Sequence, residues 1–343
     1  MAEFFAAYGL FIAKIVTFFI FFLIMFGMIV SAKKGAKGEG QLTVSNLNEK
    51  YQQMKEALRA SVMDKKALKK LIKQEKKAEK AAEKEKSKDD EEETRNKVYV
   101  LDFEGDIKAS AVSSLRDEVT AILTAIEEGD EVFIRLNNSG GVVHEHGLAA
   151  SQLVRFKEKN IPLTIAVDKV AASGGYMMAC VADRVLAAPF AIVGSIGVIA
   201  QLPNFNRLLN RVGVDFEQHT AGEYKRNVTM FGKNTSKERK QLKEQLSDIH
   251  DLFRGFVTKF RPSLDMEKVG TGEYWYGSKA LELGLVDELI TSDDYLLSLS
   301  ESCDIFLIKM EQPKSFMEKM GKGGASLYES AIDGLSKQSS DRY

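Results

Sequence analysis

From residue 98 onward, short apolar runs rich in β-branched residues alternate with helical patterns, and this alternation limits the fold more than any other feature. The apolar runs cover 98–103, 132–136, 163–167 and 184–187, each with the length and composition of a strand. Helical patterns lie around 113–128 and 148–159. Strands that alternate with helices are joined by crossover connections, so the sequence predicts an α/β domain.

A stretch without any charged residue, 185–206, resembles a membrane span at first sight. Pro189, Gly194, Gly197 and Pro203 interrupt it. Because such residues favour turns, buried strands joined by tight glycine turns explain the stretch better.

The N-terminal segment is apolar enough for a membrane helix. Residues 15–32 carry no charge, and eighteen residues at about 1.5 Å each match the hydrocarbon thickness of a bilayer. A cleaved signal peptide is the competing interpretation, since Val30 and Ala32 resemble a cleavage site, but Glu3 and the long apolar core argue against it. The sequence therefore predicts a transmembrane anchor over 1–34.

The charges beside this span favour a cytoplasmic location for the rest of the chain. Lys33, Lys34 and Lys37 follow the span and Glu3 precedes it, and positive flanks stay in the cytoplasm. Because Lys14 lies on the other side, the rule leaves the side of the membrane open.

Residues 35–97 are rich in Lys, Glu and Ala and are expected to form a charged helical stalk. Asn46 and Glu49 have the spacing of a capping box. A coiled coil or a nucleic-acid-binding arm is the alternative, but the acidic run 89–93 cancels much of the positive charge, and the whole chain has 48 Lys plus Arg against 49 Asp plus Glu. A globular domain over 98–310 and a loosely ordered tail over 311–343 are expected to follow.

The cysteines and histidines give no sign of a metal or cofactor site. Cys180 and Cys303 lie far apart, match no zinc or redox spacing, and are expected to be structural. The four histidines are too few and too scattered for a metal cluster. His144 and His146 flank Glu145, and this pair is expected to lie in a solvated turn.

The segment most informative about chemistry is 168–180, DKVAASGGYMMAC. Ser173 follows a predicted strand there and precedes two glycines and a short apolar helix. Backbone N–H donors and the positive end of the helix dipole surround a hydroxyl in such a position, and both stabilise the oxyanion of a tetrahedral intermediate. Gly174 can supply one N–H, so Ser173 is a candidate nucleophile.

A second glycine pair, Gly140 and Gly141, follows the strand 132–136 and offers another oxyanion donor. Either pair alone is explained by an ordinary strand-to-helix turn, whereas the two together indicate a site. A serine nucleophile also needs a base, and no histidine stands in a context that suggests this role. A lysine can serve if burial lowers its pKa from about 10.4 toward neutrality, but composition cannot choose among 48 basic residues.

Several longer segments follow one another in an unusual order: HGLAASQL, VDKVAASGGYMMACVAD, APFAIVGSIGVIAQLPNFNR, HTAGEYKR and GEYWYGSKALELGLVDEL. Through these segments, residues 98–290 resemble the signal-peptide peptidase A and SohB family of membrane serine peptidases. The core of that family is similar to that of the Clp protease and crotonase superfamily. The resemblance implies a core of stacked βαβ units, with the transmembrane helix and the stalk on its N-terminal side.

The resemblance also implies roles for particular residues. Family members carry the nucleophile in the ASGGY segment, here Ser173, and the general base in the AGxYK segment, here Lys225. The serine of the GSIG turn, here Ser195, is implied to orient the lysine amine. Gly174 and Gly141 would form the oxyanion hole.

One departure from the family concerns its SPGG turn, which appears here as Asn138-Ser139-Gly140-Gly141 and lacks the stiffening proline. Family members also assemble into ring- or dome-shaped oligomers in which the serine and the lysine can come from different protomers. The resemblance therefore implies a homo-oligomer whose dyad can form on assembly.

Together these features predict a serine endopeptidase anchored in a bacterial inner membrane by one helix. Its expected substrates are hydrophobic or membrane-derived peptides, and no metal, cofactor or nucleic acid is expected. Met177, Met178 and the segment 192–199 would suit such peptides, but core packing explains them equally well. The alternatives are a crotonase-like acyl-CoA enzyme, whose fold also holds an oxyanion with backbone N–H groups, and a catalytically silent membrane adaptor, which the altered turn favours.

Overall fold

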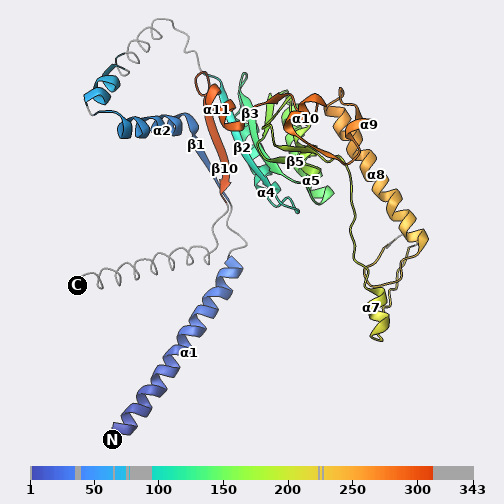
Figure 1. The fold of residues 1–343 in the computed structure, drawn as a ribbon. Helices are drawn as coiled ribbons and strands as arrows, with labels where there is room; N and C mark the ends of the chain where they lie inside the picture. The colour runs from blue at the N-terminus through green and yellow to red at the C-terminus, as the bar shows by residue number, and fades with distance from the viewer. Residues whose placement is uncertain are drawn as a thin grey trace, which may run out of the picture. The chain divides into compact units, whose positions relative to one another are not determined.

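The computed structural model describes residues 2–34, 40–64, 66–74, 77, 95–222, 225 and 228–311. The chain divides into two compact units, one made of Met1–Thr43 with Met310–Tyr343 and the other of Val44–Lys309. All candidate residues for chemistry belong to the second unit, which Figure 1 shows as a sheet covered by helices. The tail expected over 311–343 lies outside the described residues after Glu311.

The main sheet has the strand order β1-β10-β2-β3-β4-β6-β9. The bounds are β1 Gln41–Asn46, β10 Asp304–Glu311, β2 Lys97–Gly105, β3 Glu131–Asn138, β4 Leu163–Val167, β6 Arg184–Ala187 and β9 Glu288–Leu289. From β10 to β9, all neighbours pair in parallel. Helices α4 (Val112–Ala125) and α5 (Val143–Glu158) make the crossovers from β2 to β3 and from β3 to β4. The predicted α/β domain with βαβ units is confirmed.

The central strands contain continuous apolar runs because successive side chains enter two different hydrophobic clusters. In β2, Leu101 and Phe103 belong to a cluster that includes residues of α4, α5 and α6 (Gly174–Ala179). The alternate residues Val98 and Val100 belong to a second cluster, which includes Tyr295 of α11 (Ser292–Leu299). Helices therefore cover both faces of the sheet.

Three short strands branch from the carboxyl end of β3. β5 (Val170–Ala172) pairs in parallel with β3 at Asn138 and Ala171, β7 (Ile192–Gly194) pairs in parallel with β5, and β8 (Tyr274–Tyr276) pairs antiparallel to β7. The residues that follow β3, β5 and β7 consequently meet at one edge. Ligands of α/β proteins bind beyond the carboxyl ends of parallel strands, so this edge is the place to look for a site.

A long helix, α8 (Ser236–Phe260), begins after Thr235, whose side chain forms a capping box with Glu238. The buried residues of α8, Phe253 and Val257, lie near its C-terminal end. Figure 1 shows that the N-terminal end of α8 and the short helix α7 (Asn206–Arg211) lie away from the sheet. The segment that contains Lys225 connects these two helices.

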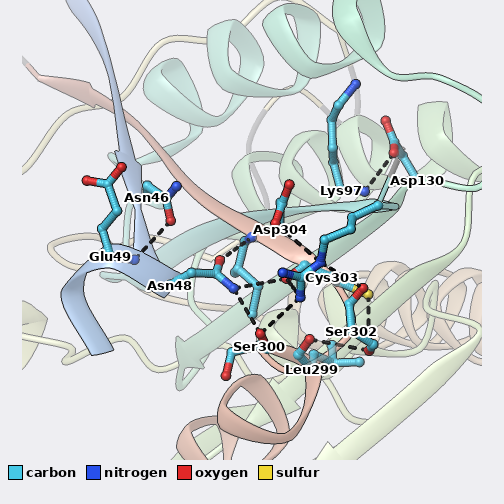
Figure 2. Close-up of polar contacts among 12 residues, drawn as sticks. Asn46, Asn48, Glu49, Lys97, Asp130, Leu299, Ser300, Ser302, Cys303 and Asp304 are labelled. Carbon is cyan, nitrogen blue, oxygen red and sulfur yellow. Dashed lines mark hydrogen bonds and ion pairs between the residues drawn. The ribbon is translucent and has the colours of Figure 1, made fainter. Parts of the chain in front are cut away.

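Asn46 is the N-cap of helix α2 (Leu47–Val62), as the capping spacing predicts. The Asn46 side chain accepts a hydrogen bond from Glu49 N–H at 3.2 Å (Figure 2). Leu47, the first residue of the helix, is buried in the cluster that contains Tyr295.

The half-buried side-chain amide of Asn48 also joins the start of α2 to the C-terminal part of the domain. Asn48 Nδ2 donates to Ser300 O and to Cys303 O, both at 3.0 Å, and Asn48 Oδ1 accepts from Ile305 N–H at 2.7 Å (Figure 2). The compact unit therefore begins at Val44, inside the range 35–97 expected to be a stalk. Only a few residues make these contacts, and the Lys- and Glu-rich sequence around them gives no sign that this part of the chain packs against the domain.

Helix α1 (Ala2–Lys34) is continuous and contains the whole uncharged run. Its described aromatic side chains are exposed, among them Phe4 at 68% and Phe18 at 72%. Within the described residues, no helix was found with the length and apolar character that crossing a membrane requires.

Candidate active site

Ser173 lies between β5 and α6 in a backbone conformation that few serines adopt. Its φ of 53° and ψ of −118° fall in a region that residues with a Cβ normally avoid. The Ser173 N–H donates to Gly194 O at 2.8 Å, and its carbonyl accepts from Met177 N–H at 3.0 Å. Strained turns between a strand and a helix present catalytic serines in other folds, and here the half-buried side chain is presented in the same way.

The turn after β3 packs directly against Ser173. Gly140 has a φ of +85°, and a Cβ on this residue would lie 2.7 Å from Ser173 Cβ and 2.8 Å from Gly174 N. Only glycine combines that conformation with so close an approach. The two glycine pairs recognised in the sequence therefore meet in space.

Two backbone N–H groups at this junction, those of Gly141 and Gly174, make no hydrogen bond to another described residue. Gly174 is the first residue of α6, where a helix leaves its N–H groups unpaired. The Gly140 N–H differs, because it donates to Asn138 Oδ1 at 2.9 Å. The two open groups are those expected to bind an oxyanion.

Ser195 follows β7 as Ser173 follows β5. Its φ is also 53°, and its N–H donates to Glu273 O at 2.6 Å. Because Ala172 pairs with Gly194, the two serines leave neighbouring strands at the same level. The structure thus brings Ser173, Ser195 and the Gly140–Gly141 turn together.

Lys225 is the candidate residue that the structure does not bring to the others. Its side chain is exposed, and its N–H donates to Gly222 O at 3.2 Å. Within the described part of a single chain, no contact joins Lys225 to Ser173 or Ser195.

The expectation that His144 and His146 lie in a solvated turn is wrong for His146. His144 is exposed, but His146 in the first turn of α5 has 0% exposure. A Cβ on Gly174 would lie 2.5 Å from His146 Cγ, so the imidazole occupies the space that a side chain at 174 would need. Local sequence shows only a charged neighbour, Glu145, and not this contact with a distant glycine.

Buried polar contacts fix the body of α6 behind the site. The Tyr176 hydroxyl donates to Leu285 O at 2.9 Å. On the same side, Arg261 donates to both carboxylate oxygens of Asp287 at 2.7 and 2.8 Å. Burial acts to raise the pKa of the Asp287 carboxyl, but the hydrogen bonds from Arg261 and from Val185 N–H outweigh it and lower that pKa.

The chain matches a known family over most of its length. Residues 3–153 match Peptidase family S49 N-terminal, and residues 155–305 match Peptidase family S49. The protein called "Probable protease SohB" in Haemophilus influenzae is 46% identical over 322 residues, which cover 92% of this chain and 91% of that protein. A protein of the same name in Buchnera aphidicola is 48% identical over 315 residues, which cover 91% of both.

Solved structures show a weaker likeness. The 1510-N membrane-bound stomatin-specific protease in complex with a substrate peptide is 15% identical, with a TM-score of 0.43 over 66% of this chain and 96% of that chain. The ClpP protease catalytic domain from Plasmodium falciparum is 11% identical, with a TM-score of 0.35 over 57% of this chain and 86% of that chain. Neither score is high enough to support an argument about the site.

Proposed function

This chain belongs to peptidase family S49, and from that premise we propose that it is a membrane-anchored serine endopeptidase with a Clp-like core and Ser173 as its nucleophile. The observation that carries the proposal is the strained turn at Ser173, which lies against Gly140 and beside the open N–H groups of Gly174 and Gly141. Backbone N–H groups in such a place stabilise the charge that develops on a peptide carbonyl oxygen.

In the proposed reaction, Ser173 Oγ attacks the carbonyl carbon while the uncharged amine of Lys225 takes the hydroxyl proton. The tetrahedral oxyanion is bound by the N–H groups of Gly174 and Gly141. The C–N bond then breaks, Lys225 gives its proton to the leaving amine, and an ester remains on Ser173. Water attacks the ester with the same amine as base, which releases the new carboxylate and restores the serine. Ser195 orients the amine through its hydroxyl.

The base requires a second subunit in this proposal. A lysine accepts a proton only when desolvation keeps its amine uncharged, and Lys225 is exposed in the single chain. Lys225 belongs to an arm, the segment 206–235, whose described residues also expose large apolar side chains, including Leu208 at 56% and Val212 at 64%. A subunit interface would cover them. We therefore assign the dyad to two protomers, with Lys225 of one reaching Ser173 of the next.

Helix α1 is proposed to hold the peptidase in a bacterial inner membrane. The proposal rests on the uncharged run inside one helix of Ala2–Lys34 and on the exposure of its described aromatic side chains, which lipid accommodates better than water. An anchored site meets peptides that lie in or near the bilayer, so hydrophobic or membrane-derived peptides are the proposed substrates.

Covalent labelling with a fluorophosphonate probe tests the nucleophile and the base. We expect the detergent-solubilised full-length protein to be labelled at Ser173, and labelling to be lost in Ser173→Ala and in Lys225→Ala. Lys233→Ala changes another exposed lysine of the same arm and is expected to label like the wild type. An assembled wild type that does not react would refute the peptidase proposal in favour of an adaptor, and saturable acyl-CoA binding in its place would favour a crotonase-like enzyme.

Mixed oligomers test whether the dyad is shared. Ser173→Ala and Lys225→Ala chains with different tags are co-expressed, and doubly tagged oligomers are purified. In a random equal mixture of head-to-tail subunits, about one site in four combines an intact serine with an intact lysine, so about a quarter of wild-type activity is expected. No activity in such mixtures would place both residues of the dyad in one chain.

A further inference from the structure

Asn138, the last residue of β3, holds the turn that follows it. It is buried, with 1% exposure, and its Oδ1 accepts from Gly140 N–H at 2.9 Å. The same oxygen lies 3.2 Å from His146 Nε2, and Asn138 Nδ2 donates to Met178 Sδ at 3.4 Å. One side chain thus joins the turn to α5 and to α6.

His146 holds the other end of the same turn. Its Nδ1 lies 3.0 Å from Val142 O, while its Nε2 faces Asn138 Oδ1. Both partners are oxygen acceptors, so the ring donates to one of them when it is neutral and to both when it is doubly protonated. The imidazole therefore connects the start of the turn with its end and packs over Gly174 at the same time.

We propose that Asn138 and His146 are positioning residues that fix the Gly141 N–H relative to the Gly174 N–H. This inference rests on the proposed function, in which these two groups bind the oxyanion. His146 contacts both loops that supply them, through Val142 on one side and Gly174 on the other. Because both imidazole nitrogens face partners within the turn, neither is directed to Ser173 Oγ as a base would be.

The need for such a pair follows from the turn's sequence. Gly140 and Gly141 are flexible, and residue 139 is serine, so the covalent stiffness of a proline is absent. Hydrogen bonds from buried side chains supply the order instead. A carbonyl oxygen is stabilised only by donors held in place, and displacement by about 1 Å can cost about 100-fold in rate.

Two variants each remove the polar contacts of one member of the pair, and a third variant restores order in the turn with a proline. Asn138→Leu keeps the size of the side chain without its polar atoms, and His146→Phe keeps a ring without nitrogens. Ser139→Pro in the Asn138→Leu background adds stiffness, and it fits because the preceding residue is already extended in β3. Asn137→Leu is the matched control, because the Asn137 side chain bonds Glu104 instead of the turn.

Two readouts on the full-length protein separate this inference from the proposed function. Hydrogen exchange of the peptide that covers 139–147 reports order without requiring activity, and we expect it to be about tenfold or more faster in Asn138→Leu and His146→Phe. The fluorophosphonate labelling rate and kcat of these variants are expected to fall by about 10- to 100-fold with KM changed less than about threefold. Ser139→Pro is expected to recover most of both losses in Asn138→Leu.

Unchanged exchange in Asn138→Leu and His146→Phe would overturn the inference whether or not the wild type is labelled. Faster exchange with a wild-type labelling rate would overturn it as well, since the turn would then be dispensable for the oxyanion. A loss that the proline does not recover, or an equal loss in Asn137→Leu, would indicate general disruption of the domain and would also count against it. A wild type that fails to label, with the exchange effects present, would instead refute the proposed function.

Discussion

Replacing Ser173 by glycine is expected to leave a more stable protein than replacing it by alanine. Both substitutions remove the hydroxyl, so both variants lack the candidate nucleophile. They differ in the Cβ, which at φ 53° and ψ −118° is the atom that makes the conformation unfavourable. Alanine retains the conflict and glycine removes it.

The size of the difference follows from the backbone geometry. A residue with a Cβ in such a region carries about 1–3 kcal/mol of strain. Glycine recovers this energy but loses about 0.4–1 kcal/mol through the greater freedom of the unfolded chain. From the middle of each range, about 2 and about 0.7 kcal/mol, we expect Ser173→Gly to exceed Ser173→Ala by about 1.3 kcal/mol in free energy of unfolding.

Urea unfolding followed by tryptophan fluorescence measures the difference. The chain has one tryptophan, Trp275, which packs against Gly194 next to the site. Ser151 in helix α5 is the matched control because its backbone is helical, and there glycine should be less stable than alanine by about 1 kcal/mol. An alanine variant at 173 that is as stable as the glycine variant, with the control behaving as stated, would show that Ser173 is not strained.

Three further predictions concern the support of the site and the two cysteines. Arg261→Ala should lower the free energy of unfolding by about 3 kcal/mol, because Arg261 is nearly buried and its loss leaves Asp287 without its charged partner; a change below about 1 kcal/mol would contradict this. The pKa of Asp287 is lower in the folded protein than its ordinary value, so ionisation of this carboxyl stabilises the fold at pH values above the ordinary carboxyl pKa of about 4. That contribution is lost as the pH falls through the pKa of the folded protein. Asp287→Asn should therefore flatten the decline of the urea midpoint between about pH 5 and pH 2. Burial raises the pKa of the Cys180 thiol, so a maleimide should label Cys303 in the native protein and Cys180 only after unfolding, as mass spectrometry of each peptide can show.

Four strands of the main sheet, β2, β3, β4 and β6, could be predicted because their buried residues form short apolar runs. The run 163–167 matches β4 residue for residue, and local signals also indicated that Ser173 stands between a strand and a helix. These features depend on neighbours in sequence, which a single chain displays directly.

The support of the site could not be predicted because it depends on contacts between distant residues. The burial of His146 follows from the missing side chain at Gly174 and from the carboxamide of Asn138, and neither appears in the pattern around residue 146. Lys225 is a different case: in the proposed function a second subunit covers it, and a single chain does not contain that surface.

The hydrogen bonds of Asn48 to the end of the domain limit the length of chain that can separate α1 from the sheet. Because the chain enters the sheet at β1, before α2, the residues that follow α2 do not lengthen the connection to α1. Only seven Cα–Cα steps separate Lys34 from Gln41, and they span at most about 25 Å when fully extended. With α1 in the membrane as proposed, this upper limit on the length of the connection would favour substrates that lie at or near the bilayer surface.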